Sequence, residues 1–318
     1  METVNCDLCG RDDADVVYRE ARWRQPVPEG VALVRCRTCG LMYLSPRPRR
    51  SEIAQYYPSE YGAYRTAVED DRFPPMRWMR RRKLALRRRL IERYSHLGRG
   101  TILDVGCATG LFLHEMALAG WDAAGVELSG AAAEYGRARY GLQIHEGTLE
   151  EATLAAASLD VITYWDVLEH TFSPRAELEH AATLLRPGGL LVINVPNFGS
   201  AERWVFGPYW IGFDPPRHLY VFSRATLARL LAETGFAILG WRCMMPSFFS
   251  ATVSLDRLLN ARMPRWAVLV NRLLSLPGAR FPFEPALTLL NWLHLGGTIA
   301  VFACLKGAQL EAWPGSAR

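Results

Sequence analysis

Four of the seven cysteines form two CxxCG pairs, Cys6 with Cys9 and Cys36 with Cys39. In the reducing compartment that we expect for this chain, such pairs indicate metal ligation rather than disulfides. Each tight turn directs two thiolates at one ion, and the following glycine permits the turn. We therefore predict a structural zinc site with four cysteine ligands. Disulfides are the alternative, and a redox-active pair is less favoured because neither pair lies in a strand–helix unit.

A second group of reactive side chains lies in residues 165–170, WDVLEH, where Asp166, Glu169 and His170 fall within five positions. The group follows the apolar run LDVITY, which has the composition of a buried strand. It could transfer a proton, hold a divalent cation or only cap and orient a loop. His218, in the segment FDPPRHLYVFS, is an alternative proton acceptor.

A third group surrounds the segment DVGCATG, residues 104–110, between a predicted strand and a helix. Its small residues let the backbone approach a ligand, and the helix N-terminus supplies unpaired N–H groups. Gly106 and Gly110 are four residues apart and no lysine follows, so neither the dinucleotide fingerprint nor the P-loop fits. Asp104 suits a ligand with positive charge, and Glu127, after the next strand, can accept hydrogen bonds from a ribose diol.

These groups need elements to position them, and from Thr101 onward apolar runs alternate with helical stretches. This βαβ pattern predicts an α/β fold with a doubly wound, Rossmann-like sheet of seven strands. FAILGWRC is expected as the sixth strand and TIAVFACL as the seventh. We also expect a helix that begins after Ser223 as its N-cap and ends at Gly235.

The predicted organisation has four parts. They are a zinc-ribbon module at 1–50, a connector with a basic amphipathic helix at 51–97, the main domain at 98–245 and 297–306, and a helical insertion at 246–296. The insertion is expected to cover one end of the sheet, either as a lid or as an apolar substrate pocket. The uncharged stretch 285–305 is long enough to cross a bilayer, but Gly296 and Gly297 interrupt it, so a helix followed by a strand is favoured.

Charge and composition limit the class of protein. Half of the 318 residues are apolar, which is ample for a packed core. The N-terminus has neither a basic nor an apolar signal region, so we expect a cytoplasmic protein. Residues 77–93 hold nine basic side chains, with Met79, Leu86, Leu90 and Tyr94 near helical spacing. We expect a basic outer face, either merely solvated or in contact with a phosphate-bearing substrate, an anionic membrane or RNA.

In order and spacing, DVGCATG, Glu127, WDVLEH and RPGGLLVINVPN resemble the motifs of class I S-adenosylmethionine-dependent methyltransferases, over about residues 98–245 plus the last strand. Ala108 replaces the middle glycine of the most familiar loop. The resemblance implies S-adenosylmethionine as cofactor, with Glu127 on the ribose and Asp166 near the methionine portion. The cofactor-binding residues predicted in this way are Asp104, Gly106, Cys107, Gly110, Glu127, Leu128, Thr148, Leu149 and Asp166.

The cysteine pairs followed by this domain also resemble zinc-ribbon methyltransferases of sugar, antibiotic or envelope pathways. We predict methyl transfer to a small-molecule acceptor, foremost at a hydroxyl oxygen of a sugar, natural product or lipid-linked intermediate. His170 and His218 are the candidate bases. Four aromatic residues near His218 either line an acceptor pocket or pack as ordinary core or lid residues: Trp204, Tyr209, Trp210 and Phe213. Asp166, Glu169 and His170 also resemble the pattern of ubiquinone-pathway O-methyltransferases, in which a hard cation can lie near the acceptor.

Two other functions remain open from the sequence. A zinc ribbon and a basic helix also resemble ribosomal RNA guanine methyltransferases, but those usually carry (N/D)PP and an aromatic residue after strand four. WDVLEH occupies that place, and Asp214-Pro215-Pro216 comes one strand later. The other alternative is a non-catalytic zinc-ribbon interaction protein, which the intact cofactor motifs disfavour. The sequence makes no prediction of the oligomeric state.

Overall fold

The computed structural model describes residues 1–23, 27–57, 74–244, 248–276 and 278–307. Part of the predicted connector, residues 58–73, therefore lies outside the described residues. Of residues 74–76 only the backbone is described.

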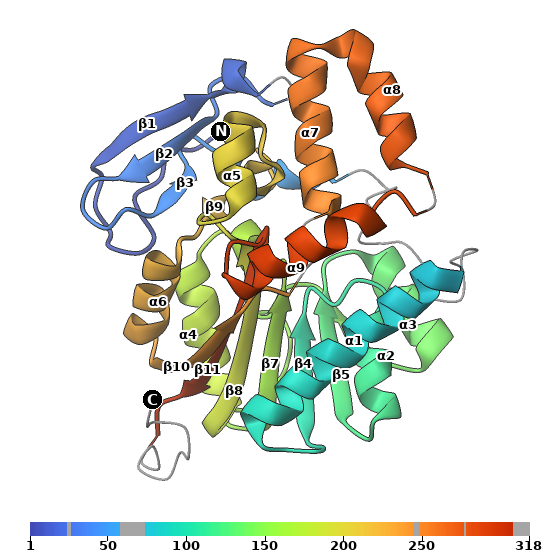
Figure 1. The fold of residues 1–318 in the computed structure, drawn as a ribbon. Helices are drawn as coiled ribbons and strands as arrows, with labels where there is room; N and C mark the ends of the chain where they lie inside the picture. The colour runs from blue at the N-terminus through green and yellow to red at the C-terminus, as the bar shows by residue number, and fades with distance from the viewer. Residues whose placement is uncertain (24–26, 58–73, 245–247, 277, 308–318) are drawn as a thin grey trace.

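The main sheet has seven strands in the order β10-β11-β8-β7-β4-β5-β6 (Figure 1). Its strands are β4 Thr101–Val105, β5 Asp122–Glu127, β6 Gln143–Glu146, β7 Leu159–Trp165, β8 Leu185–Pro196, β10 Phe236–Arg242 and β11 Thr298–Leu305. β11 pairs antiparallel with both β8 and β10. The α/β prediction and the assignment of the last two strands are confirmed. The strand order reverses between β4 and β7, and ligands of such sheets bind outside the carboxyl ends at that point.

Helices cover both faces of this sheet (Figure 1). They are α1 Pro74–Ser95, α2 Leu111–Leu118, α3 Gly130–Tyr140, α4 Pro174–Leu184 and α6 Arg224–Glu233. Ser223 caps α6 in a capping box with Thr226, and Gly235 follows with a φ of 93°, as the sequence predicts.

The predicted outer face of α1 was partly wrong. Leu84 and Ile91 face the core, while Leu86 is exposed. The inward face therefore also carries Lys83 and Arg87, one helical turn apart, and both side chains are partly buried. They lie near Asp166 rather than on the solvated surface.

The N-terminal residues form a second, four-stranded antiparallel sheet. Its strands are β1 Ala14–Arg19, β2 Ala32–Cys36, β3 Met42–Leu44 and β9 Tyr220–Val221. The short β9 belongs to the segment after β8, and its register aligns Met42 with Val221 and Tyr43 with Tyr220. One hydrophobic cluster runs from this sheet into the main domain. The four-part organisation stays a prediction. Because the ribbon shares its core with the main domain, its boundary at residue 50 is the part of that organisation most open to test.

The remaining helices lie with the ribbon at the edge where the parallel strands end (Figure 1). They are α5 Ala201–Phe206, α7 Phe248–Arg262, α8 Pro264–Leu274 and α9 Glu284–Trp292, with 3-10 turns at Glu20–Arg22, Ile53–Tyr56, Gly207–Tyr209 and Phe281–Phe283. The uncharged stretch 285–305 is helix α9 followed by strand β11, as favoured from the sequence. Among the described residues, no helix has the length and apolar character needed to cross a membrane.

Candidate functional site

The loop after β4 turns through left-handed residues. Gly106, Ala108 and Gly110 have φ angles of 68°, 49° and 74°. A Cβ at Gly106 would lie 2.5 Å from Cγ2 of Val167, and one at Gly110 would lie 2.5 Å from Cδ1 of Leu142. Both positions therefore require glycine, for their conformation and for the close approach. Alanine at 108 keeps the left-handed path at a cost of roughly 1–2 kcal/mol.

Two buried carboxylates flank this loop. The Asp104 carboxylate accepts a hydrogen bond from Oγ1 of Thr163 at 2.6 Å, and burial raises the pKa of Asp104 to about 7. Glu127 accepts the N–H of Ala108 at Oε2 and the N–H of Ser129 at Oε1, both at 2.8 Å. Burial raises the pKa of Glu127 against these bonds. Each Glu127 oxygen has a second acceptor position, which suits a diol.

The other predicted cofactor residues have different surroundings. The Cys107 side chain is buried in a cluster with Leu113 and Ala133, so only its backbone borders the loop. Leu149 is buried in the main core, whereas Leu128 is largely exposed beside Glu127. Both the N–H and the hydroxyl of Thr148 donate to the Glu151 carboxylate, at 2.7 and 2.9 Å. A ligand at Thr148 would therefore meet a side chain that is already hydrogen-bonded.

Asp166 lies at the end of β7 with a left-handed φ of 61° and accepts a hydrogen bond from Nδ2 of Asn194 at 2.6 Å. Arg87 stacks its guanidinium over the Trp165 ring, 4.1 Å from the centroid, and its Nε is buried without a hydrogen-bond partner among the described residues. Burial lowers the pKa of Arg87 and brings the pKa of Lys83 to about 8, against the attraction of Asp166. Two partly buried cations thus lie near Asp166, at the end of β7.

The basic pattern of residues 77–93 did not single out these two cations. Lys83 and Arg87 were counted among nine basic residues of a surface helix. Their i, i+4 spacing, in register with Leu84 and Ile91, was the signal that could have placed them on the inward face.

The structure gathers Glu169 and His170, from the 3-10 turn Leu168–His170 after β7, with His218 from the loop after β8. The potential ligand atoms of the three side chains all lie within 4.8 Å of one another. The imidazole rings pack edge to face with centroids 4.7 Å apart. Leu219 N–H donates to the carbonyl of Glu169 at 2.8 Å and so joins the two loops. We call these three residues the site cluster.

Backbone carbonyls orient both histidines. Nδ1 of His218 lies 2.9 Å from the carbonyl of Gly212, and Nδ1 of His170 lies 3.0 Å from that of Arg217 and 2.9 Å from the hydroxyl of Tyr57. A carbonyl only accepts, so each Nδ1 carries the proton and each Nε2 keeps a lone pair. Burial lowers the pKa of both, to about 3 for His170. Both imidazoles are therefore neutral at pH 7.

Glu169 is the unusual member of the site cluster. Both of its carboxylate oxygens are buried without a hydrogen-bond partner among the described residues. Burial, and then repulsion from Asp166, raises the pKa of Glu169 well above its usual value. An acceptor in this position requires a proton or a cation to compensate for lost water. The carboxylate of Asp166 faces Asn194 instead, so the structure pairs Glu169 and His170 with His218 rather than with Asp166.

The aromatic residues near this loop fall into a buried group and an exposed group. Trp210 and Phe213 are fully buried and pack edge to face at 5.1 Å, which is ordinary core packing. Trp204 is exposed beneath the guanidinium of Arg203.

Asp214 is bound by two arginines, at 2.6 Å by Arg217 and at 2.5 Å by Arg257 of α7. Burial opposes its ionisation, but His218 and the two arginines outweigh it and lower the pKa of Asp214. Arg217 and Arg257 are therefore engaged with Asp214, and α7 is fastened to the loop that carries His218.

The ribbon gathers its four cysteines as predicted. Sγ of Cys6 lies 3.4 Å from that of Cys39, and Sγ of Cys9 lies 3.5 Å from that of Cys36. All seven cysteines of the chain are free, and these four have their sulfurs within 4.8 Å of one another. A tetrahedral zinc with bonds of 2.3 Å needs sulfurs about 3.8 Å apart, so the set fits such an ion. Gly10 and Gly40 follow with φ angles of 72° and 77°.

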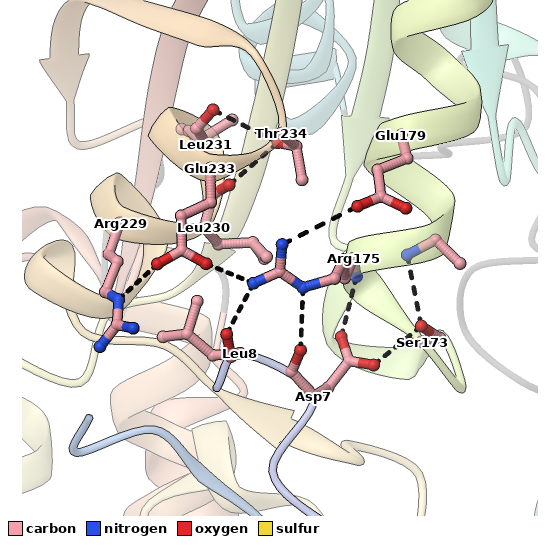
Figure 2. Close-up of polar contacts among 11 residues, drawn as sticks. Asp7, Leu8, Ser173, Arg175, Glu179, Arg229, Leu230, Leu231, Glu233 and Thr234 are labelled. Carbon is pink, nitrogen blue, oxygen red and sulfur yellow. Dashed lines mark hydrogen bonds and ion pairs between the residues drawn. The ribbon is translucent and has the colours of Figure 1, made fainter. Parts of the chain in front are cut away.

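The ribbon is fastened to the start of α4 through Asp7, which lies between two of these cysteines (Figure 2). Its carboxylate accepts the hydroxyl of Ser173 and the backbone N–H of Arg175, both at 2.8 Å. The Arg175 guanidinium donates to the carbonyls of Asp7 and Leu8 at 3.2 and 2.6 Å and also pairs with Glu233. The turn between Cys6 and Cys9 therefore holds the residues that directly follow the His170 turn.

A second connection holds the same segment from its other side. Nη1 of Arg47 and the hydroxyl of Tyr220 both donate to the carbonyl of Phe172, at 3.0 and 3.1 Å. Arg47 is buried and its Nε donates to Glu2 at 2.8 Å. Since Tyr220 also lies in β9, the ribbon contacts both loops of the site cluster.

Comparison with known proteins identifies one family and several similar proteins. The profile of a methyltransferase domain family matches residues 77–240. The chain is 33% identical over 161 residues to a ubiquinone biosynthesis O-methyltransferase of Paraburkholderia phymatum, which is 48% of this chain and 68% of that protein. An enzyme of the same name from Paraburkholderia phytofirmans is 32% identical over 148 residues, 44% of this chain and 63% of its own length. A crystal structure of a SAM dependent methyltransferase from Archaeoglobus fulgidus has 17% identity, a TM-score of 0.44, and covers 70% of this chain and 94% of that one.

Proposed function

The chain belongs to the S-adenosylmethionine-dependent methyltransferases, and we propose that it methylates a hydroxyl oxygen of a small molecule. A sugar, a natural product or a lipid-linked intermediate is the acceptor class we favour. The site cluster is the observation that supports this choice. It places two neutral imidazoles and a carboxylate within 4.8 Å of one another, at the edge where β7 and β8 end. A hydroxyl acceptor, unlike a thiolate, needs a group that removes its proton.

The cofactor, when bound, supplies a methyl group already activated on a sulfonium. We propose that the Glu127 carboxylate holds its ribose with the acceptor positions left by the two backbone N–H groups. Asp104 and Asp166 would attract the positively charged groups of the cofactor. Arg87 and Lys83 would neutralise the carboxylate of the cofactor's amino acid portion. The buried Nε of Arg87 without a described partner supports the last assignment.

We propose His218 as the base. The hydroxyl proton would pass to Nε2 of His218 as the oxygen–methyl bond forms and the bond between methyl and sulfonium breaks. An oxygen of Glu169 would accept a hydrogen bond from the resulting imidazolium. His170 is the weaker base, because its pKa is lowered to about 3. We assign it a positioning role beside His218, against which its ring packs edge to face.

A divalent cation held by the site cluster is the second candidate. The two unpartnered oxygens of Glu169 and the two free Nε2 lone pairs favour it. Two imidazoles and a carboxylate are a common ligand set for such ions. The ion would supply Lewis acidity toward an acceptor hydroxyl.

We propose that the four ribbon cysteines hold a structural zinc. All four ligand positions would be filled by protein, which leaves none for a substrate. The ion would therefore stabilise the ribbon and take no part in methyl transfer.

Calorimetry with S-adenosylmethionine tests cofactor binding without knowledge of the acceptor. Glu127→Ala should weaken binding by roughly tenfold or more, while Glu134→Ala, at an exposed acid of the neighbouring helix, should not. Arg87→Met should also weaken binding, and Arg89→Met on the exposed side of α1 serves as its control. Unchanged affinity in Glu127→Ala would refute the ribose assignment, and no binding by the parent chain would refute the proposed function.

Turnover of hydroxyl acceptors, measured as S-adenosylhomocysteine release, tests the base. His218→Asn should lower kcat by ~10²- to 10⁴-fold and leave cofactor affinity unchanged. Because burial lowers the pKa of both histidines, they protonate only at acid pH. The rate should therefore fall as pH decreases below about 6.5 and stay level above it. Activity that requires added Mn²⁺ or Mg²⁺ after chelation would favour the cation instead.

Binding of RNA is the competing partner class. Asp214, the first residue of the DPP segment, is engaged by two arginines. RNA recognition would show as affinity that falls ~10³- to 10⁵-fold between roughly 50 and 200 mM salt. We expect no such binding.

A further inference from the structure

The outward face of α8 carries large apolar side chains beside two arginines, where a surface helix is usually mainly polar. Ala267 is 1% exposed, and Asn271, four residues later, donates to Asp256 of α7. These two residues define the face that packs on α7. Leu269 projects on the opposite side, because each residue advances about 100° around the helix. A helix packed by one face normally turns charged residues outward there.

Large apolar side chains occupy this outward face and its flank. They are Trp266 (59% exposed), Val268 (76%), Leu269 (49%) and Leu273 (54%). Trp266, Leu269 and Leu273 follow i, i+3, i+7 spacing and so form one stripe. Gathered exposed residues of this kind mark an interaction surface rather than chance exposure.

The charges beside this stripe have one sign. Residues 257–283 contain five arginines and no acidic residue. Arg257 pairs with Asp214, and Arg280 pairs with Glu284. For Arg262, Arg265 and Arg272 no ion pair is recorded within the described part of the chain. Arg265 and Arg272 lie seven residues apart, along one side of the apolar stripe.

We propose that the α7–α8 hairpin docks on the surface of an anionic lipid bilayer. Arginines would pair with the phosphates of the headgroups, and tryptophan and leucine side chains would enter the boundary between headgroups and acyl chains. The hairpin would lie on the membrane rather than cross it, because no described helix is able to span. This inference goes beyond the proposed function and does not depend on it.

The charge pattern argues against a second copy of the chain as the occupant. A twofold interface brings the same surface of each subunit together. Arg262, Arg265 and Arg272 would then face a surface that carries the same three arginines and, between 257 and 283, no acid to compensate. An anionic bilayer supplies the missing negative charge over the whole surface.

Docking in this place would bring the site toward the membrane. Arg257 of α7 pairs with Asp214, and the hydroxyl of Ser254 accepts the N–H of Ile211 at 3.0 Å. Both partners belong to the segment that leads to His218. The docked hairpin would therefore hold the segment 211–214 through α7.

Cosedimentation with vesicles tests the proposal on the full-length protein. We expect binding to vesicles of phosphatidylglycerol and phosphatidylcholine that is at least tenfold stronger than to phosphatidylcholine alone, and that weakens in high salt. Arg262→Gln, Arg265→Gln and Arg272→Gln together should weaken it about 10²-fold, at about fivefold per charge. Trp266→Ser, Leu269→Ser and Leu273→Ser together should weaken it at least tenfold.

Two control variants separate this surface from others. Arg82→Gln, Arg89→Gln and Arg93→Gln together remove three exposed charges from α1 and should leave vesicle binding unchanged. Leu118→Ser, at an exposed leucine on α2, should also leave it unchanged. Melting temperature and S-adenosylmethionine affinity check that each variant is folded.

Three results would overturn the proposal. The first is absence of binding to anionic vesicles by the parent protein. The second is loss of binding in the α1 variant but not in the α8 variants. The third is a concentration-dependent dimer in analytical ultracentrifugation that the Trp266, Leu269 and Leu273 substitutions dissociate, which would assign the surface to a second copy.

Discussion

The N-terminal ribbon and the C-terminal hairpin lie at the same edge of the sheet but place their apolar residues in opposite ways. In β2 and β3 of the ribbon every residue except Arg35 is buried, and the apolar ones among them join the core of the main domain. In α8 only Ala267 is buried, and the larger apolar side chains lie at the surface. The ribbon is built into the fold, whereas the hairpin presents a surface to something outside it.

This difference separates two roles near one site. The ribbon contacts the segments that carry Glu169, His170 and His218, through Asp7, Arg47 and Tyr220. We infer that it keeps the two loops in register. The hairpin contacts the segment before His218 through Arg257 and Ser254. Its exposed side is the surface that we propose for docking.

Loss of a ribbon cysteine is expected to have the largest effect. Cys36→Ser removes one of the four thiolates, and a structural zinc contributes roughly 10 to 16 kcal/mol of apparent binding energy. We expect loss of bound zinc and a cooperative loss of ribbon structure, measured by metal analysis and circular dichroism. Cys243→Ser, outside the cluster, is the control and should retain one equivalent of zinc. Full zinc retention in Cys36→Ser would show that the cluster is not a four-cysteine site.

A core leucine of the ribbon comes next. Leu33 is 1% exposed, so Leu33→Ala should reduce the free energy of unfolding by about 2–5 kcal/mol through lost burial and a cavity. Urea denaturation measures this change. A loss below about 1 kcal/mol would mean that the ribbon does not share the core of the main domain.

The link between the ribbon and α4 has an intermediate effect. Asp7→Ala removes charge-assisted bonds to Ser173 and Arg175, each worth about 1.5–3 kcal/mol. We expect a loss of that order in urea denaturation, with faster hydrogen exchange around His170. Asp13→Ala removes an exposed pair with Arg37 and should cost at most about 1 kcal/mol. Equal losses in both variants would count against a specific role for Asp7.

The matched leucine of the hairpin should have the smallest effect on stability. Leu269→Ala changes the same atoms as Leu33→Ala, but its side chain is 49% exposed. We expect a change within about 0.5 kcal/mol, measured by the same denaturation. A loss near that of Leu33→Ala would show that the leucine is buried in the solution state and would weaken the contrast between the two regions.

Local sequence patterns were sufficient for much of this architecture. The alternation of apolar runs and helices predicted the sheet, and Ser223 with Gly235 predicted both ends of α6. The CxxCG pairs predicted that four thiols would meet, as their sulfurs do. For the strands and for α6, the residues that predict the element lie within it or next to it. For the cysteines, the affinity of thiolates for one metal ion predicts that the two pairs meet.

Features that depend on contacts between distant parts of the chain could not be predicted from local sequence patterns. The two-residue strand β9 has no periodicity, and only its pairing with β3 brings it into the ribbon. The approach of His218 to Glu169 and His170 depends on how two loops pack, so the predicted cation set included Asp166 instead. Lys83 and Arg87 looked solvated because the expected apolar stripe followed Leu86 and Leu90, whereas the inward face follows Leu84 and Ile91.

Hydrogen exchange with mass spectrometry, before and after removal of metal by a chelator, tests the central claim most directly. If the ribbon holds the site loops, peptides covering residues 166–176 should lose protection together with those of the ribbon. Peptides covering 248–274 should exchange as before. Ribbon peptides that lose protection while 166–176 remain protected would contradict the account.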